Sequence, residues 1–221
     1  MAGACAPVAA MRIDALAARL KEGAVPATPI SARGGALFDS TGLPFVLKGA
    51  NLPNWETAPP LTYRVMRQRW NMNQVRFPLS VAAWRRDGQA YLDRAAKAVA
   101  AANAENLVVL LAAVGDEPDR FPGPNTLAFW RATAAAFRNN PLTLFSLYNE
   151  PARGDGRGWP EWRAAMQPMI DAIRAAGAAQ VIAVPAYHDS TGFLGLPGEL
   201  FPSGADLMLE AHPYFDLAPT E

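Results

Sequence analysis

The sequence is poor in the residues that mark several large classes of protein. Its 221 residues include one cysteine, Cys5, and two histidines, His188 and His212. A single cysteine excludes an internal disulfide framework and a cysteine-rich zinc site. The HExxH, GxSxG and P-loop patterns are also absent, so the sequence offers no positive evidence for the chemistries that they accompany.

Net charge and long apolar runs are lacking as well. Twenty basic and twenty acidic side chains cancel, so the chain has no strong field to attract nucleic acid or an anionic membrane. No run approaches the roughly eighteen apolar residues of a membrane span. Arg12, Asp14 and Arg19 interrupt residues 1–22, which therefore lack the uninterrupted apolar stretch of a secretory signal. We expect no nucleic-acid partner and no membrane partner, and the sequence leaves the compartment open.

The length and the 51% hydrophobic content fit one ordinary globular domain with a sizeable core. Residues 11–22 place apolar side chains on a helical face, which predicts a short helix and a linker over residues 1–34. In residues 35–49, two short apolar runs flank a turn-rich cluster at residues 39–42, which predicts a hairpin. We therefore divide the chain into an N-terminal segment and a domain over residues 35–221.

After the hairpin, apolar strand candidates alternate with amphipathic or alanine-rich helical candidates. This alternation is typical of a parallel sheet covered by helices. The expected strands are residues 45–50, 74–78, 106–113, 142–148, 181–185 and 205–211. The expected helices are residues 60–70, 91–103, 126–138 and 160–176. The connection over residues 186–204 is rich in glycine and proline and predicts no clear helix.

Two architectures share this alternation. One is an open doubly wound sheet, and the other is a (β/α)8 barrel of which about six βα units are present. Periodicity does not distinguish them. A Rossmann-type sheet carries a glycine-rich phosphate turn after its first strand, whereas residues 49–53 read GANLP, without GxGxxG. The nucleotide-binding alternative is therefore weakened.

The strongest local motif is Asn149-Glu150-Pro151, which follows the apolar run at residues 142–148. In a barrel the C-terminal ends of the strands form the active-site face, so Asn149 and Glu150 would lie at its mouth. A carboxylic acid that is partly desolvated there can have its pKa raised enough to hold a proton near neutral pH. A strand-to-helix turn without chemistry would give the same tripeptide, and the other motifs decide between the two readings.

Four blocks together resemble glycoside hydrolase family 5, a family of barrel glycosidases with the acid/base on strand four and the nucleophile on strand seven. They are residues 47–52 (LKGANL), 73–78 (NQVRFP), 146–151 (SLYNEP) and 210–214 (EAHPY), in the family's order and on the expected strands. The resemblance covers roughly residues 35–216. It implies an α/β fold, a (β/α)8 TIM barrel that is incomplete here at about six βα units.

The resemblance assigns roles to the residues of the second and third blocks. It implies that Glu150 is the catalytic acid/base, and that Asn149 orients it and contacts the sugar 2-hydroxyl. It also implies that Arg76 supports the nucleophile. A guanidinium on an apolar strand needs a carboxylate partner, and an ordinary interior salt bridge is the alternative reading for Arg76.

Three further residues are supporting or substrate-binding candidates by the same resemblance. His212 and Tyr214 match the family's His-x-Tyr pair near the substrate. Asn51 belongs to the first block. A lone histidine is more often structural, and we interpret His188, after the fifth strand, as a loop residue without a chemical role.

The six tryptophans fall into two groups. Three lie in predicted helices and are expected to pack against the sheet: Trp70, Trp130 and Trp162. Three lie in predicted loops after strands one, two and four: Trp55, Trp84 and Trp159. Indoles in such loops could stack on pyranose rings, and covering the small core of a loop is the alternative for each.

The sequence departs from the family pattern at two places. Strand three lacks the family's terminal histidine, and Asp116 or Glu117 is expected to take over part of that subsite. The nucleophilic glutamate belongs to strand seven, whereas the sixth expected strand ends near His212. Glu210 shares a face with His212 but is a poor candidate for a nucleophile. Because a retaining mechanism needs a pair of carboxyl groups about 5–5.5 Å apart, we expect the nucleophile downstream of the chain.

The resemblance implies a retaining hydrolase for β-linked polysaccharide such as cellulose or mannan, with an oligo- or polysaccharide partner and no metal or organic cofactor. The alternative is a carbohydrate-binding barrel fragment that does not turn its ligand over. Family resemblance also implies secretion, although no signal peptide is visible. Open edges on the first and sixth strands would favour self-association.

Overall fold

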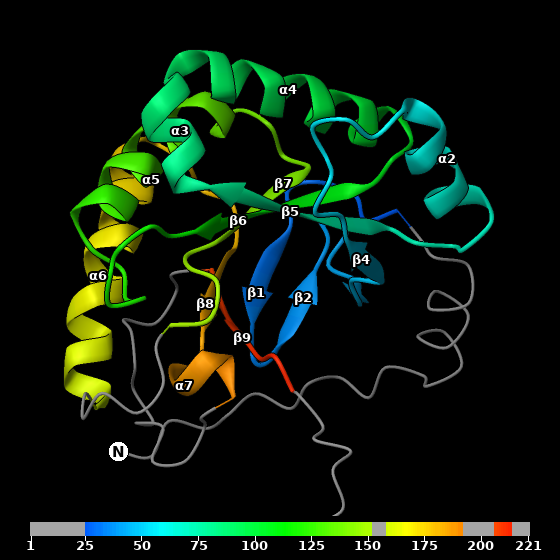
Figure 1. Ribbon diagram of the computed structural model, residues 1–221. Helices are drawn as coiled ribbons and strands as arrows, with labels where there is room; N and C mark the ends of the chain where they lie inside the picture. Colours follow the sequence, from blue (N-terminus) through cyan, green and yellow to red (C-terminus); the bar gives the residue numbers. More distant parts are fainter. Residues whose placement is uncertain (1–24, 152–157, 192–205, 214–221) are drawn as a thin grey trace, which may run out of the picture.

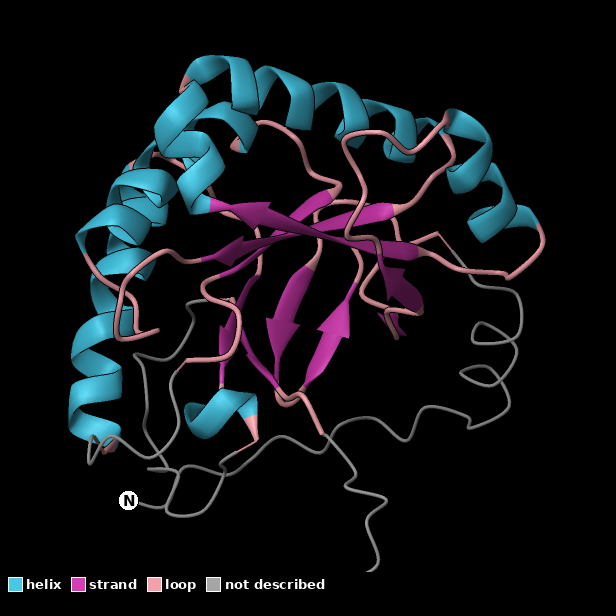
Figure 2. Ribbon diagram, viewed as in Figure 1, coloured by secondary structure: helices cyan, strands magenta, loops and turns pink. Residues whose placement is uncertain are grey.

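The chain forms two sheets, and the larger one is a curved parallel sheet with helices on its outer side (Figures 1 and 2). This computed structural model describes residues 25–151, 158–191 and 206–213. The helix expected at residues 11–22 and the candidate Tyr214 lie outside these residues.

The larger sheet contains six parallel strands that neighbour one another in sequence order. Five of them lie at predicted apolar runs, because a strand that is covered on both faces is a nearly continuous apolar segment. The first strand overlaps its predicted range, residues 45–50, only at residues 49–50, and Phe45 belongs to the smaller sheet. The curl of the sheet in Figure 1 and its unbroken order make it a partial (β/α)8 barrel, as the resemblance implies. The strands are β4 (Gly49–Asn51), β5 (Gln74–Ser80), β6 (Val108–Val114), β7 (Thr143–Ser146), β8 (Ile182–Pro185) and β9 (Leu207–Glu210).

Helices connect these strands and cover the convex side of the sheet (Figure 1). Their apolar faces pack on the outward-facing side chains of the strands, such as Phe77, Leu111 and Phe145. Four helices lie at predicted positions: α2 (Pro60–Gln68), α4 (Gln89–Ala104), α5 (Pro124–Phe137) and α6 (Trp159–Ala175). Within the described ranges, no helix combines the length and the apolar character that crossing a membrane requires.

Two short helices were not predicted. The helix α3 (Val81–Asp87) begins where the Ser80 hydroxyl accepts a hydrogen bond from the Ala83 amide at 3.1 Å, an N-cap that Ser at a strand end supplies. Gly88, with φ 57°, separates α3 from α4. The helix α7 (Tyr187–Ser190) occupies the start of the fifth connection.

The smaller sheet is antiparallel and contains β1 (Ser31–Arg33), β2 (Ala36–Phe38) and β3 (Pro44–Phe45). The turn predicted between β2 and β3 is confirmed, and the Asp39 carboxylate accepts hydrogen bonds from the amides inside it. A second hairpin precedes it, because Gly34 and Gly35 adopt positive φ and let β1 turn back onto β2. The small sheet thus begins at Ser31, a few residues before the boundary that we placed after residue 34.

This smaller sheet packs on the concave side of the larger one. Its strand β1 contacts β9, and the Ala32 amide donates to the Asp206 carboxylate at 2.9 Å. Figure 1 shows β1 and β2 beneath β5 and β6. Buried apolar side chains from both sheets form a small inner cluster, which we call the floor: Ile30, Phe45, Val108, Leu110, Leu144, Val181 and Ala183.

Three indoles fasten the outer layer to the strands. Each is buried and donates its N–H to a backbone carbonyl at or near the C-terminal end of a strand, which satisfies a buried polar group. We call these hydrogen bonds the indole latches. They join Trp55 to Pro78 at 3.0 Å, Trp130 to Leu147 at 2.8 Å and Trp162 to Pro185 at 3.0 Å.

Candidate active site

Polar side chains face the concave side of the barrel from three alternate strands. Arg76 in β5, Ser146 in β7 and Glu210 in β9 alternate along their strands with outward-facing residues such as Phe77 and Phe145. In a (β/α)8 barrel, alternate strands contribute the side chains of one interior layer. These three residues form such a layer, which we call the polar layer.

Arg76 is the hub of the polar layer. Its Nη2 donates to Asn149 Oδ1 at 3.0 Å and lies 3.4 Å from Glu210 Oε1, and its Nη1 donates to Asn51 Oδ1 at 3.3 Å. The side chains of Arg76 and Glu210 are only 13% and 11% exposed, so water screens their ion pair little. The carboxylate that the position of Arg76 requires is therefore Glu210. The Nε of Arg76 is buried and has no hydrogen-bond partner among the described residues.

The segment that carries Glu150 is held from two sides. The Asn149 amide donates to the Ala113 carbonyl of β6 at 2.7 Å, and the Leu147 amide donates to the Ala183 carbonyl of β8 at 3.0 Å. Glu150 itself has φ 53°, in the left-handed region that costs a non-glycine residue on the order of 1–3 kcal/mol. Such strain persists only where the surrounding structure imposes it, and these strand contacts do so.

His212 joins the two carboxylates of the site. Its Nδ1 lies 2.9 Å from Glu150 Oε1, and its Nε2 lies 2.9 Å from Glu210 Oε1. The His212 amide donates to the Ser190 carbonyl at 2.9 Å, which fixes the backbone beyond β9. The structure therefore brings the predicted residues Glu150, Asn149, Arg76, Asn51 and His212 into one connected network.

Glu210 is the member of this network whose importance the sequence motifs alone did not indicate. The Ser146 hydroxyl donates to its Oε2, and Arg76 and His212 both contact its Oε1. Two signals pointed to it, namely the spacing of two residues from His212 and the need of Arg76 for a carboxylate. Neither signal identifies the partner without the strand register that brings β5, β7 and β9 together.

The network sets the charge states of Glu210 and His212. Burial favours the neutral acid, yet the hydrogen bond with His212, the charge of Arg76 and the hydrogen bond from Ser146 together hold the pKa of Glu210 below its usual value. The hydrogen bond with Glu210 raises the pKa of His212, and that with Glu150 adds to the effect, against the opposing effect of burial. Glu210 is therefore an anion at neutral pH, and His212 holds its second proton to a higher pH than a free histidine does.

The end of strand three does not form the subsite that we expected. Glu117 is buried and accepts hydrogen bonds from the Gly123 and Thr126 amides, so it is engaged with the first turn of α5. Asp116 forms an ion pair with Arg85 at 2.7 Å. Both carboxylates thus serve contacts within the fold.

The loop tryptophans differ from their predicted settings. Trp55 is 2% exposed and stacks on Phe77 at 5.7 Å, so the prediction that it offers a face to a sugar is wrong. Trp84 lies in α3 instead of a loop and is half-buried against Phe129. Trp159 begins α6 and packs edge-on against Trp162 at 5.1 Å, also half-buried. Of the three, Trp84 and Trp159 keep some exposed surface.

Two of the three helical tryptophans behave as predicted. Trp130 and Trp162 are fully buried beneath the helices. Trp70 follows α2 and is 56% exposed, so the prediction that it packs on the sheet is wrong. The apolar face of α2 is provided by Tyr63 and Met66, and Trp70 lies beyond the helix end.

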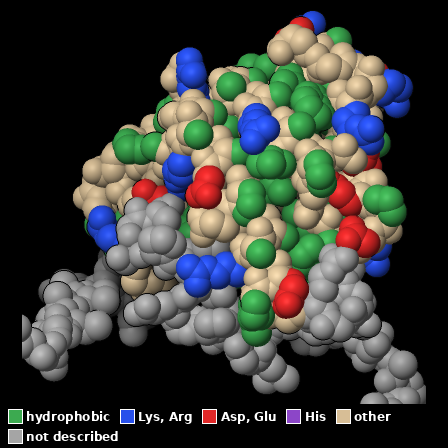
Figure 3. Space-filling view, turned by 90° about the vertical axis from the view of Figure 1, so that its left-hand side faces the viewer, with side chains coloured by type: hydrophobic (Ala, Val, Ile, Leu, Met, Phe, Trp, Pro, Cys, Tyr) green, Lys and Arg blue, Asp and Glu red, His purple; other side chains and the backbone are tan. Residues whose placement is uncertain are grey.

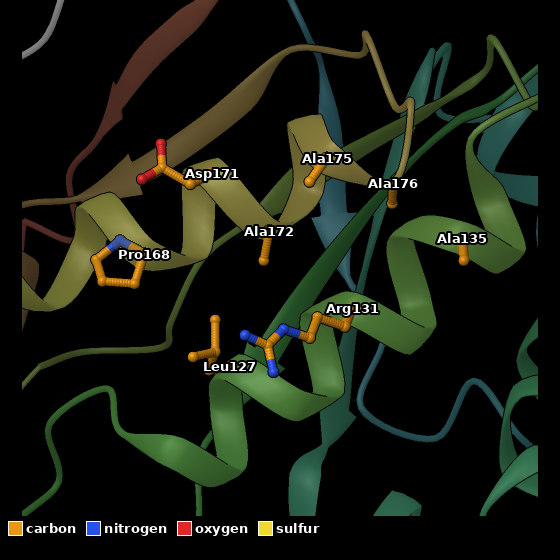
Figure 4. A pocket seen from close by; sticks show the side chains of 8 residues that line it. All are labelled: Leu127, Arg131, Ala135, Pro168, Asp171, Ala172, Ala175 and Ala176. Carbon is orange, nitrogen blue, oxygen red and sulfur yellow. The ribbon is translucent and has the colours of Figure 1, made fainter.

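The outer surface carries a hollow of about 580 Å³, away from the polar layer. Figure 4 shows that it lies between α5 and α6, with Arg131 and Asp171 among small alanine side chains. On the flank of the molecule shown in Figure 3, basic and acidic side chains are interspersed among apolar ones. Neither feature brings together groups of the kind found around Glu150.

The fold and the network define the class of this protein, a (β/α)-barrel protein with a carboxylate–histidine–carboxylate site at the C-terminal ends of its strands. Residues 38–220 match the family model described as Cellulase (glycosyl hydrolase family 5). The chain therefore belongs to glycosyl hydrolase family 5.

Solved structures share the fold. A beta-glucanase from Saccharophagus degradans is 22% identical, with a TM-score of 0.73, and the match covers 88% of this chain and 64% of the glucanase. The catalytic domain of the Thermobifida fusca endoglucanase Cel5A is 19% identical (TM-score 0.64; 73% and 55% covered). A beta-mannanase from Thermomonospora fusca is 18% identical (TM-score 0.70; 85% and 66% covered). The chain thus spans about 55% to 66% of these three structures.

Proposed function

We propose that this chain carries the acid/base half of a retaining hydrolase for β-linked glycans, with Glu150 as the general acid and base. The observation that carries the proposal is the network at the strand ends in which His212 contacts Glu150 and, through Glu210, links it to Arg76 and Asn149. Membership of the family and the likeness to a glucanase, an endoglucanase and a mannanase support a β-glycan substrate.

The hydrogen bonds of Asn149 suit it for contact with the sugar. A guanidinium can only donate, so the atom of Asn149 that faces Arg76 must be the carbonyl Oδ1. The Nδ2 amide then remains as a donor, and a donor is what a sugar 2-hydroxyl oxygen needs as the transition state develops. Arg76 therefore fixes the orientation of this amide.

Glu150 would protonate the leaving oxygen in the first step and deprotonate a water in the second. The second step requires a glycosyl intermediate on a nucleophile about 5–5.5 Å from Glu150. Glu210 is poorly suited to that role, because Ser146, Arg76 and His212 occupy both of its oxygens. We propose that the nucleophile is the strand-seven glutamate of the family, beyond residue 221, and that the unpaired Nε of Arg76 leaves a donor for it.

The test is hydrolysis of soluble β-glucans and mannans by the protein extended through that seventh strand, with Glu150→Gln alongside. We expect the substitution to lower the rate on polysaccharide by about 10²–10⁴-fold, the contribution of a general acid. An aryl glycoside whose leaving group needs no proton should lose far less in its first step. Glu105→Gln, at an exposed ion pair with Arg64, is the matched control and should keep full activity. Equal loss on both substrates would contradict the role of Glu150 as the acid.

A second candidate function is binding of an oligosaccharide without turnover by the 221-residue chain. Glu210 is the described carboxylate nearest to Glu150 in the network, and it is already engaged in contacts with Ser146, Arg76 and His212. This observation favours binding without turnover. Calorimetric titration with cello- and manno-oligosaccharides tests it. Binding without product would support this function for the chain alone, whereas hydrolysis that Glu150→Gln abolishes would place a nucleophile within it.

A further inference from the structure

We propose that Glu210 is a positioning residue that keeps a proton on Nε2 of His212, so that Nδ1, the nitrogen facing Glu150, is the one that gains and loses a proton. This role rests on the proposed function of Glu150 for its catalytic meaning. The state of the imidazole ring itself can be measured without any hydrolysis.

The contacts of Glu210 decide which ring nitrogen is the donor. Arg76 Nη2 lies 3.4 Å from Oε1, and the Ser146 hydroxyl donates to Oε2, so both oxygens face groups that carry hydrogen. An ionised carboxylate can only accept. The contact of 2.9 Å between Glu210 Oε1 and His212 Nε2 therefore requires a hydrogen on Nε2, whatever the pH at which Glu210 remains ionised. A histidine whose partner is an anion of this kind has its tautomer fixed by that partner.

The hydrogen on Nε2 leaves Nδ1 as the ring nitrogen that exchanges a proton with Glu150. Nδ1 lies 2.9 Å from Glu150 Oε1, and with Nε2 committed it is the only ring atom that can exchange a proton with this carboxyl group. When Nδ1 is protonated, it donates to Oε1 of Glu150.

Charged groups on three segments face the ring and determine its titration. They are Glu210 from β9, Glu150 from the segment after β7, and Arg76 from β5. The two carboxylates favour the doubly protonated ring, and Arg76 opposes it. Because Glu210 contributes more than Glu150, substitution of Glu210 should have the larger effect.

The experiment is nitrogen-15 NMR of the imidazole rings over a pH titration of the full chain. The sequence holds two histidines, and a His188→Gln variant assigns their signals. We expect neutral His212 to be the Nε2–H tautomer, and its pKa to lie above the ordinary value near 6.5. A neutral ring with its proton mainly on Nδ1 would overturn the proposal.

Three variants separate positioning from general stability. Glu210→Gln should shift the tautomer ratio by on the order of tenfold, the effect of losing one charge-assisted hydrogen bond, and lower the pKa of His212. Ser146→Ala loosens Glu210 without touching the ring and should shift both quantities in the same direction by less, which keeps the test valid if Glu210→Gln fails to fold. Glu150→Gln should lower the pKa and leave the Nε2–H tautomer in place. An unchanged tautomer ratio in Glu210→Gln, or in Ser146→Ala if only that variant folds, would contradict the proposal that Glu210 keeps the proton on Nε2.

These outcomes are distinguishable from failure of the proposed function. If Glu150 has no catalytic role, the ring of His212 still shows the tautomer that Glu210 imposes. If Glu210 has no positioning role, the ring fails the NMR test even where Glu150 is essential for hydrolysis.

Discussion

The concave side of this half-barrel holds two regions that share the strand β7 and differ in what holds them together. The floor is apolar, and residues of the small sheet fill it. The polar layer is held by hydrogen bonds and an ion pair between side chains from β5, β7 and β9. In β7 the change takes two residues, from buried Leu144 in the floor to Ser146 in the polar layer. One strand thus supplies packing at one end and chemistry at the other, because both residues share its inward face.

This comparison predicts that the two regions fail in different ways. A substitution in the floor should cost stability and leave the titration of His212 unchanged. A substitution in the polar layer should alter the charge states around Glu150 as well as the stability. The following predictions test that separation in order of expected effect.

The largest effect is expected from Phe45→Ala in the floor. Phe45 is 5% exposed, and its removal leaves a cavity between the two sheets, so the free energy of unfolding should fall by about 3–5 kcal/mol. Urea denaturation measures the loss, with the neighbouring and 49% exposed Val46→Ala as the control. A change in the pKa of His212 in folded Phe45→Ala would break the separation between floor and polar layer.

Arg76→Met should cost about 3 kcal/mol, because it removes the guanidinium that pairs with the Glu210 carboxylate, whose side chain is only 11% exposed. The pKa of Glu210 is depressed in the folded state, so the stability it contributes is present above its unfolded pKa near 4.5 and is lost as the pH falls through the folded value. The difference between wild type and Arg76→Met should therefore be full at pH 7 and shrink below about pH 4.5. A difference that does not depend on pH would mean that Arg76 acts through packing alone.

Trp130→Phe removes one indole latch and keeps an aromatic ring in the core. The Leu147 carbonyl then loses its donor, at a cost of about 1–3 kcal/mol. Thermal or urea unfolding measures it. Trp70→Phe, at a 56% exposed site, should change stability by less than about 0.5 kcal/mol. Equal effects of the two substitutions would show that the latch contributes nothing.

The smallest effect is expected from the pH dependence that His212 adds. The pKa of His212 is raised in the folded state, so its contribution is full below the unfolded pKa near 6.5 and is lost as the pH rises through the folded value. Wild type should thus lose stability relative to His212→Gln on going from pH 6 upward. Denaturant midpoints at several pH values measure this, and parallel curves for the two proteins would contradict the raised pKa.

Much of the fold followed from the sequence, and the reason is the burial of its strands. A parallel strand that is covered on both faces needs apolar residues throughout, so runs such as residues 106–113 mark their strands directly. The hairpin turn at Asp39 was predictable because its turn residues are local. The additional hairpin at Gly34 and the helix α3 after Ser80 were missed, since each depends on one turn or cap residue instead of a long pattern.

The site followed from the sequence only in part. Glu150, Asn149 and Arg76 were predicted because a resemblance joined motifs that lie far apart in the chain, and the structure places Arg76 against Asn149 and His212 against Glu150. The setting of Trp55 was mispredicted, because a loop position does not reveal that a side chain folds back onto Phe77. The role of Glu210 depends on which strands are neighbours, and no local pattern contains that information.

The indole latches also allow the opening of separate parts of this barrel to be followed one by one. Each latch proton is a single indole N–H that donates to a carbonyl at or near the C-terminal end of a different strand, and it exchanges with deuterium only when its own sector opens. Exchange at Trp55 reports the opening of β5, exchange at Trp130 that of β7, and exchange at Trp162 that of β8. The order in which the three protons exchange is therefore the order in which these three sectors of the sheet open, and two of them, β5 and β7, carry residues of the polar layer.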